Sequence, residues 1–194
     1  IPKELDSKTA ALTEPLAVVL RAIRRIRSRL SKDSAVAVVG AGPIGNLCVQ
    51  VLCHEDYKIS IFDRNSDRLK ILEDKVDQTA TVLGDLDKFN VIIDATGSKQ
   101  VLDRVLSDSR IDSTILLMGF PYGELKYNFE NLVGLEKVIV GSVGAEREDF
   151  ANALRLLSKL DMAPFIQTVM PLEDFEKAWR LHKTSKHLKI LLKP

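Results

Sequence analysis

The chain has 194 residues, of which 45% are hydrophobic and 28% are charged, and its formal net charge is +1. This balance is typical of a folded protein with one well-filled core, and it excludes the disordered and collagen-like classes. A nearly neutral chain has no field that would gather nucleic acid or an anionic membrane. No apolar stretch approaches the ~20 residues of a transmembrane helix, so we expect neither nucleic acid nor a membrane as a partner.

The cysteines and the start of the chain bear on its cellular setting. Cys48 and Cys53 lie in an apolar run of helical period, so we predict buried thiols in a reducing, cytoplasmic compartment. No signal peptide is recognisable in the first residues. The chain begins with Ile1 and Pro2 rather than Met, which indicates a fragment, a processed product or an excised domain.

Residues 1–32 are predicted to form a linker segment and an amphipathic helix. From Glu14 to Leu30 apolar residues recur at helical spacing, opposite a face rich in arginine. That face is either a solvated surface or a phosphate or nucleic-acid patch. The solvated surface is favoured, because no aromatic residues are interleaved and the rest of the chain is neutral. The arginines of the face are Arg21, Arg24, Arg25 and Arg29.

Between residues 33 and 146, short β-branched runs alternate with helical stretches. Such strands, apolar on both faces and joined by helices, build a parallel sheet that is covered on both sides. We therefore predict an α/β fold with a doubly wound parallel sheet of six strands and helices on both faces. The predicted strands are Ala35–Val39, Lys58–Phe62, Thr79–Leu83, Val91–Asp94, Ile115–Met118 and Val138–Val140, and the helices are Ile44–Leu52, Asp67–Leu72 and Val101–Leu106.

Residues 147–194 are predicted to form a C-terminal tail of helices and a strand. We find no internal repeat and no low-complexity linker along the chain. In order, the tail contains a helix at 148–160, an amphipathic helix that carries Phe175, Trp179 and His182, and a strand at 188–192.

A Gly-x-Gly-x-x-Gly spacing follows the first predicted strand and opens the helix from Ile44. Gly40 permits the tight turn, Gly42 lets the backbone approach a pyrophosphate, and Gly45 lets the helix and strand pack closely. The helix N-terminus then offers N–H groups and a positive dipole end to phosphates. The spacing alone also suits a purely structural turn. Its place between a strand and a helix favours a dinucleotide-binding Rossmann domain over residues 33–146.

Asp63 ends the second predicted strand, at the position about 20 residues past the motif where a carboxylate accepts hydrogen bonds from the adenosine ribose. Because it would repel a 2′-phosphate, NAD is favoured over NADP. Arg64 either receives such a phosphate or is solvated, and Arg68, one helical turn further, can reach the same ribose. Flavin-binding folds also begin with Gly-Ala-Gly-Pro and form a competing class. The aspartate at the end of the second strand and the series of strands that follows favour a nicotinamide-dinucleotide fold over a flavin-binding one.

Glycine-containing segments follow three of the later strands. They are Ala95–Ser98, Gly119–Pro121 and Gly141–Gly144. Ligands of doubly wound sheets lie outside the carboxyl ends of the strands. Each of these glycines can serve only to form a turn. Together, however, the three segments are predicted to form a rim where the backbone approaches a nicotinamide ring.

At these residues the sequence resembles the medium-chain dehydrogenase/reductase family, the zinc-dependent alcohol, polyol and sugar dehydrogenases. More narrowly, the Thr13–Leu16 opening and the segment Gly141–Phe150 resemble archaeal-type glucose dehydrogenases and the sorbitol- and threonine-dehydrogenase-like members. The matching pieces occur in the family's order over nearly the whole chain: Ala11–Val19, Gly40–Gly45, Ile92–Ser98, Gly141–Val143, Pro171–Asp174 and Lys189–Pro194.

The resemblance implies a set of cofactor-binding residues. It also implies that Glu14 lies at the catalytic zinc, as a ligand or near neighbour. The alternative is a carboxylate that complements the helix dipole. The implied contacts are Gly40, Gly42, Pro43, Ile44 and Gly45 at the pyrophosphate, Asp63 and Arg68 around the adenosine ribose, and Thr96, Gly119, Phe120, Ser142 and Val143 at the nicotinamide.

The chain departs from the family because the N-terminal catalytic domain, with its Cys and His-Glu zinc ligands, is missing before Ile1. Zinc is implied for that domain alone. No Cys or His here replaces those ligands, since Cys53 and His54 are predicted to be a core thiol beside a surface imidazole. The tail at 147–194 is expected to pack toward the absent domain.

Two functions remain open at this point. In the first, the chain is the coenzyme half of an NAD-dependent dehydrogenase of small alcohols, polyols or sugars and is inactive alone. In the second, it is a stand-alone dinucleotide-binding module without catalysis. Members of the resembled family often dimerise through the edge strand of the coenzyme sheet, which predicts a homo-oligomer that pairs along Lys137–Val143.

Overall fold

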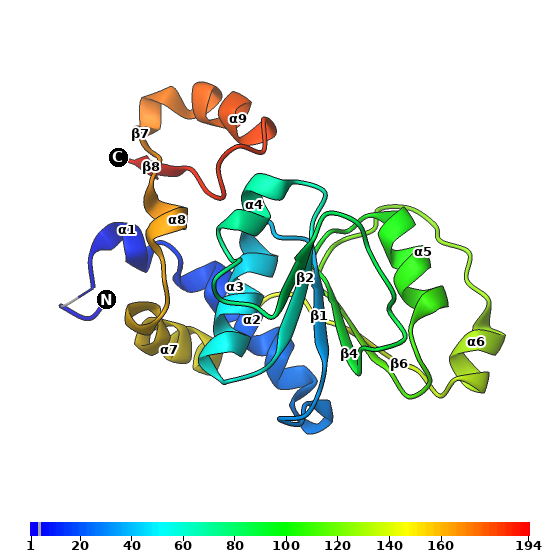
Figure 1. Cartoon of the computed structure of the whole chain (residues 1–194). Coiled ribbons are helices and arrows are strands. Elements are labelled where there is room, and N and C mark those ends of the chain that lie inside the picture. Colours follow the sequence, from blue (N-terminus) through cyan, green and yellow to red (C-terminus); the bar gives the residue numbers. More distant parts are fainter. Residues whose placement is uncertain (4) are drawn as a thin grey trace.

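The computed structural model describes residues 1–3 and 5–194, and its centre is a six-stranded parallel sheet (Figure 1). The strand order is β3-β2-β1-β4-β5-β6. This is the Rossmann order, in which the chain starts at β1 and winds first one way and then the other, and it confirms the predicted fold class. The strands are β1 (Val36–Val39), β2 (Ile59–Phe62), β3 (Gln78–Ala80), β4 (Val91–Asp94), β5 (Thr114–Leu117) and β6 (Val138–Gly141).

The carboxyl ends of these strands form one row along the sheet. Val39 pairs with Phe62 on one side and with Asp94 on the other. Leu117 in turn pairs with Asp94 and with Gly141. The segments that follow the strands therefore emerge side by side at one edge, where ligands of such sheets bind.

Helices cover both faces of the sheet (Figure 1). In the view shown, α2, α3 and α7 lie on one side, and α5 and α6 on the other. Within residues 1–3 and 5–194, no helix combines the length and the apolar content needed to cross a membrane. The helices are α1 (Ser7–Ala10), α2 (Thr13–Arg25), α3 (Pro43–His54), α4 (Ser66–Lys70), α5 (Lys99–Asp108), α6 (Phe129–Gly134), α7 (Arg147–Leu156), α8 (Ala163–Ile166) and α9 (Phe175–Lys183).

The alternation of side chains along each strand produces two cores. In β1, Val36 and Val38 belong to the core under α2, α3 and α7, whereas Ala37 and Val39 belong to the core under α5. Successive residues of a strand point to opposite faces, so a strand that is apolar throughout is buried on both. This explains why β1 is apolar at every position.

The arginine-rich helix differs from its prediction in two ways. The α-helix ends at Arg25 and continues as a 3₁₀ turn, so the regular helix is shorter than the predicted Glu14–Leu30. The predicted solvated face is observed at Arg24 and Arg25, which are exposed, but Arg21 is only partly exposed, and Arg21 and Arg24 are engaged in ion pairs. Both form ion pairs with Glu146, just before α7, because α7 packs directly on α2.

The tail divides into a part that joins the main core and a part that stands outside the sheet. Phe165 of α8 is fully buried in the core under α2 and α3. Beyond it, β7 (Val169–Pro171) and β8 (Leu191–Lys193) form a separate two-stranded parallel sheet beside α9 (Figure 1). The predicted strand at 188–192 is thus confirmed with a shift toward the C-terminus, whereas β7 was not predicted.

The thiols agree with their prediction in part. Both cysteines are free, and Cys48 is fully buried, so desolvation raises the pKa of its thiol to about 12. Cys53 is half-buried, and its neighbour His54 is exposed at the end of α3.

Candidate functional site

The turn after β1 has the backbone conformation that only glycine adopts easily. Gly40 has a φ of +100°, and its N–H donates to the carbonyl of Phe62 at 2.7 Å. A Cβ at this position would lie 2.9 Å from Cγ2 of Thr96, which follows β4. Glycine here therefore both permits the turn and lets the ends of β1, β2 and β4 converge.

The other two glycines of the loop differ in their surroundings. A Cβ on Gly45 would lie 1.7 Å from the carbonyl oxygen of Gly40, so no side chain fits between helix and strand. A Cβ on Gly42 would meet only Nη1 of Arg68, at an ordinary 3.7 Å. The space above Gly42 therefore has room for a further atom in contact with Arg68, as a loop that admits a phosphate requires.

The helix α3 starts directly in this turn. Gly42 is its N-cap and Pro43 its first residue, a position where the missing N–H of proline costs nothing. Ile44 packs against the main core and holds the first turn of the helix in place. The first N–H groups of a helix have no partner within it, so this end offers hydrogen-bond donors beside the space above Gly42.

Asp63 joins the end of β2 to the glycine loop. Its Oδ2 accepts the N–H of Ala41 at 2.7 Å, and its Oδ1 accepts the N–H of Asn65 at 2.8 Å. Each carboxylate oxygen has a second lone pair, so both can also accept a hydroxyl hydrogen of a ligand. The neighbouring Arg64 is exposed.

Arg68 of α4 lies over the glycine loop. Its Nη1 is close to the space above Gly42, as noted, and its Nε is buried without a hydrogen-bond partner among the described residues. A buried donor of a charged group that lacks a partner costs free energy. Nη1 of the same guanidinium would donate to an anionic group above Gly42, so the residues present fit a dinucleotide pyrophosphate.

Asp94, which our sequence reasoning missed, shapes the turn after β4. It is fully buried, and its Oδ1 accepts both the N–H and the hydroxyl of Thr96, at 2.9 and 2.6 Å. Burial raises the pKa of Asp94, although the hydrogen bonds from Thr96 and the backbone of Gly97 oppose the shift. The sequence did contain a signal for this residue, because Asp94 is a carboxylate at the end of an otherwise apolar strand.

The turns after β4 and β5 touch each other. A Cβ on Gly119 would lie 2.0 Å from the backbone nitrogen of Gly97. Next to them, Phe120 is 60% exposed, and its ring stacks on Tyr122 with centroids 6.3 Å apart. Two of the predicted rim segments therefore form one surface, with an aromatic ring turned toward solvent.

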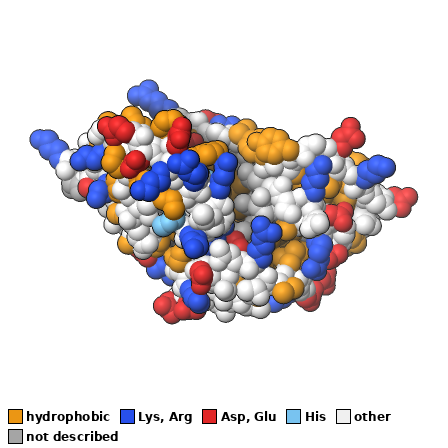
Figure 2. Space-filling view, turned by 90° about the horizontal axis from the view of Figure 1, so that it is seen from above, with side chains coloured by type: hydrophobic (Ala, Val, Ile, Leu, Met, Phe, Trp, Pro, Cys, Tyr) orange, Lys and Arg blue, Asp and Glu red, His pale blue; other side chains and the backbone are white. Residues whose placement is uncertain are grey.

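The third rim segment follows β6. The N–H of Ser142 donates to the carbonyl of Leu117 at 3.0 Å, which holds the segment against the end of β5. Val143 is exposed. Seen from above in Figure 2, white backbone and small polar atoms occupy the middle of this face, with Lys and Arg side chains around it.

The predicted cofactor-binding residues thus form one closely packed group around the glycine loop and two further pairs along the same edge of the sheet. Direct contacts join the glycine loop to Asp63, Arg68 and Thr96. Gly119 and Phe120 connect through the turn at Gly97, and Ser142 and Val143 lie at the next strand along the edge. Arg64 forms no side-chain hydrogen bond or ion pair with the described residues of this group.

The described residues do not fit a zinc site. Glu14 is exposed in the first turn of α2. In residues 1–3 and 5–194, no three His, Cys, Asp or Glu side chains come together in a group that could hold a metal. Because a catalytic zinc needs about three protein ligands, we derive no step through zinc from this chain.

Comparison with known proteins gives one family and many relatives. The family model described as Glucose dehydrogenase C-terminus matches residues 7–193. The chain is 26% identical, over its whole length, to sorbitol dehydrogenase of Halalkalibacterium halodurans, of which it covers 61%. It therefore spans about three fifths of the length of that curated relative.

Solved structures share the fold over almost the whole chain. A short chain alcohol dehydrogenase of Escherichia coli CFT073, solved with NADH, has a TM-score of 0.87 at 23% identity, over 99% of this chain and 60% of that one. TarJ of S. aureus, solved with NADPH, has a TM-score of 0.84 at 19% identity, over 100% of this chain and 66% of that one. Since the family model covers nearly all of the sequence, this chain belongs to the glucose dehydrogenase C-terminus family, the NAD(P)-binding region of the zinc-type medium-chain dehydrogenases/reductases.

Proposed function

We propose that this chain binds NAD at the glycine loop and serves as the coenzyme half of a dehydrogenase that acts on a small alcohol, polyol or sugar. The observation that carries the proposal is the room for a ligand atom above Gly42, beside Arg68. The helix end of α3, the carboxylate of Asp63 and the guanidinium of Arg68 surround that space. Backbone donors and a half-buried cation suit a diphosphate, and a carboxylate at the end of the second strand suits a ribose.

Each part of the site has its own task in this proposal. The glycine loop, with Pro43 and Ile44, holds the pyrophosphate, and Arg68 donates to it. Thr96, Gly119, Phe120, Ser142 and Val143 border the nicotinamide. When bound, NAD accepts a hydride from the carbinol carbon while the hydroxyl proton is released, and the alcohol becomes a carbonyl compound.

The preference for NAD over NADP rests on Asp63. Its carboxylate lies at the mouth of the loop and would repel a 2′-phosphate. Arg64 is exposed beside it and forms the alternative, a receptor for that phosphate. The relatives do not decide between the two, because one was solved with NADH and another with NADPH.

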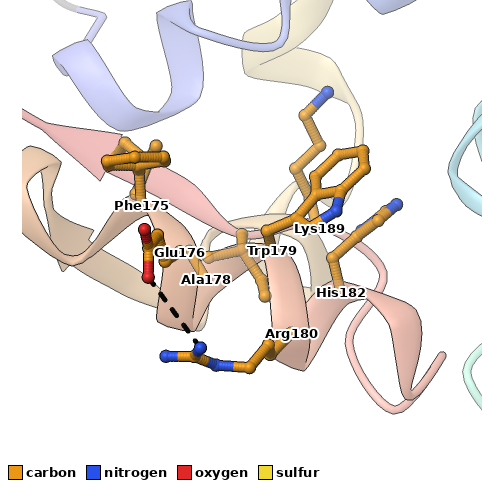
Figure 3. A pocket seen from close by; sticks show the side chains of 9 residues that line it. Phe175, Glu176, Ala178, Trp179, Arg180, His182 and Lys189 are labelled. Atoms are coloured by element: carbon orange, nitrogen blue, oxygen red, sulfur yellow. Dashed lines mark ion pairs between the residues drawn. The ribbon is translucent and has the colours of Figure 1, made fainter.

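In our proposal, the catalytic part of the enzyme is formed by polypeptide outside this chain. Glu14, at the start of α2, would lie at its zinc. Residues 147–194 would pack against it through a groove of about 750 Å³ between α9 and β8. Figure 3 shows Phe175, Trp179 and Lys189 around this groove, and both rings are largely exposed.

We further propose that two copies pair along β6, in the cytoplasm. In the described sheet β6 pairs with β5 alone, so its other edge is open, and Ile139 in its middle is partly exposed. An open strand edge with apolar side chains is prone to pairing. The cytoplasmic assignment is supported by the two free thiols.

Calorimetric titration of the chain with NAD and with NADP tests the proposal. We expect NAD to bind at least about tenfold more tightly than NADP, because the 2′-phosphate meets the carboxylate of Asp63. Tighter binding of NADP would overturn the preference, and binding of neither would overturn the cofactor assignment. With an added alcohol, the chain alone should show no turnover, and steady hydride transfer would favour a self-sufficient enzyme.

A further inference from the structure

A hollow of about 280 Å³ lies at the carboxyl ends of β5 and β6. It is separate from the phosphate loop, since β5 and β6 lie two and three strands from β1, or about 10 and 14 Å at the usual spacing. One wall is made by two arginines of α2 and the others by the rim. The lining residues are Arg21, Arg25, Leu117, Met118, Gly119, Phe120, Gly141, Ser142 and Val143.

The hollow carries one uncompensated positive charge. Nη1 of Arg21 pairs with Oε1 of Glu146 at 3.1 Å, and Arg24 shares Glu146 and Asp149, so two cations face two carboxylates. Arg25 lies one helical turn after Arg21, on the same side of α2. No carboxylate of the described residues comes within 4.0 Å of Arg25.

The lining also contains a hydroxyl that lacks a partner. Oγ of Ser142 is buried and has no hydrogen bond within the described chain, although the backbone N–H of Ser142 is bonded. Most buried hydroxyls are hydrogen-bonded, so Ser142 brings an unused hydrogen-bonding group to the wall of the hollow. An anionic oxygen in this hollow would accept hydrogen bonds from both Ser142 and Arg25.

The remaining walls narrow the choice of ligand. Leu117, Met118, Phe120 and Val143 are apolar, and such walls offer no partners for a row of sugar hydroxyls. The single free charge matches the one negative charge of a carboxylate better than the roughly two of a phosphate. The fitting group is therefore a carboxylate attached to a small body.

We propose that this hollow receives the carboxylate of the substrate, so that the substrate is a hydroxy acid rather than a neutral polyol. The inference rests on the proposed function, because the hollow is lined by residues that we place at the nicotinamide. Arg25 and Ser142 bind the carboxylate and thereby orient the alcohol carbon. Arg21 holds the adjoining wall through its ion pair with Glu146.

Two matched probes test the inference. The chain, saturated with NAD, is titrated with D-gluconate and separately with D-sorbitol, which carries an alcohol group in place of the carboxylate on the same carbon chain. Backbone amide NMR signals of Gly119 and Ser142 report binding. We expect gluconate to bind about fivefold to tenfold more tightly than sorbitol, the range of a partly exposed charge-assisted contact.

Variants show whether Arg25 is responsible. Arg25→Ala should abolish the preference for gluconate, Arg25→Lys should keep part of it, and Arg155→Ala, an equal loss of charge on α7, should leave it unchanged. Equal binding of the two probes, no detectable binding of gluconate, or a preference that survives Arg25→Ala would overturn the inference. NAD binding is measured first in each sample, so its absence marks failure of the proposed function instead.

Discussion

At the scale of single residues, the glycines of one motif have separable tasks. Gly45 touches the carbonyl of Gly40 so closely that packing alone demands glycine there. A Cβ on Gly42 would make only an ordinary contact with Arg68, so the fold accommodates a side chain there, whereas a ligand bound at the loop would not. The same residue type therefore serves the fold at one position and the ligand at the other.

This difference predicts opposite behaviour of two variants. Gly42→Val should keep the fold and abolish NAD binding, because the new side chain fills the space for the pyrophosphate. Gly45→Ala should lower the unfolding temperature markedly, because a Cβ would lie 1.7 Å from a backbone oxygen. Circular dichroism and calorimetry separate the two effects. An unfolded Gly42→Val protein would contradict this division of roles.

Asp63 carries the second prediction at this scale. Asp63→Ala should weaken NAD binding by roughly 1–3 kcal/mol, through lost charge-assisted hydrogen bonds. Because Asp63 also accepts the N–H of Ala41, the variant loosens the loop as well. Asp63→Asn, which keeps one acceptor oxygen, should bind with intermediate affinity in the same titration. Unchanged curves for both variants would remove Asp63 from the ribose site.

At the scale of elements, α7 is fixed to α2 by a buried carboxylate. Asp149 is 1% exposed and accepts Nε and Nη2 of Arg24 at 3.1 and 3.0 Å. It also accepts the N–H of Glu146 at 2.8 Å, at the start of α7. Burial raises the pKa of Asp149, but these hydrogen bonds outweigh it and leave the pKa below its ordinary value.

A lowered pKa in the folded state stabilises the fold above the unfolded value of about 3.9, and this gain is lost as the pH falls through the folded value. Asp149→Ala should therefore reduce the free energy of unfolding by about 1–2 kcal/mol at pH 7, the range of a lost helix cap. The difference from the unchanged chain should shrink below about pH 4. Urea denaturation at several pH values measures it, and a difference independent of pH would contradict the assignment.

How far the sequence predicted these elements depends on what holds each one. The six strands of the main sheet were predicted within a few residues, because β-branched runs are visible locally, and β1, β2 and β4 are buried at every position. The strand β7 has three residues and is held by pairing with β8, some 20 positions later. The position of Arg68 over Gly42 and the ion pairs of Arg24 also arise from tertiary packing, which periodicity does not contain.

At the scale of the whole molecule, the open edge of β6 and the exposed groove beside α9 lie on different parts of the surface. We have assigned the first to a second copy and the second to polypeptide outside this chain. The two surfaces can therefore be tested independently, since a change at one leaves the other intact.

The edge strand gives a prediction about assembly. The chain should sediment as a dimer, and Ile139→Lys should shift it to the monomer by placing a charge at the paired edge. Val82→Lys, which changes an exposed apolar residue after β3 at the other end of the sheet, is the matched control and should remain dimeric. A chain that stays monomeric at high concentration would refute the dimer.

Where the dinucleotide binds is the question on which the whole account depends. Amide NMR spectra of the chain, recorded while NAD is added, answer it residue by residue. We predict that the largest shifts fall on Ala41, Gly42, Ile44 and Gly45, with smaller ones at Asp63 and Gly119. Unshifted loop amides at saturating NAD, or a response there to a flavin dinucleotide or a methyl-donor nucleoside instead, would contradict it.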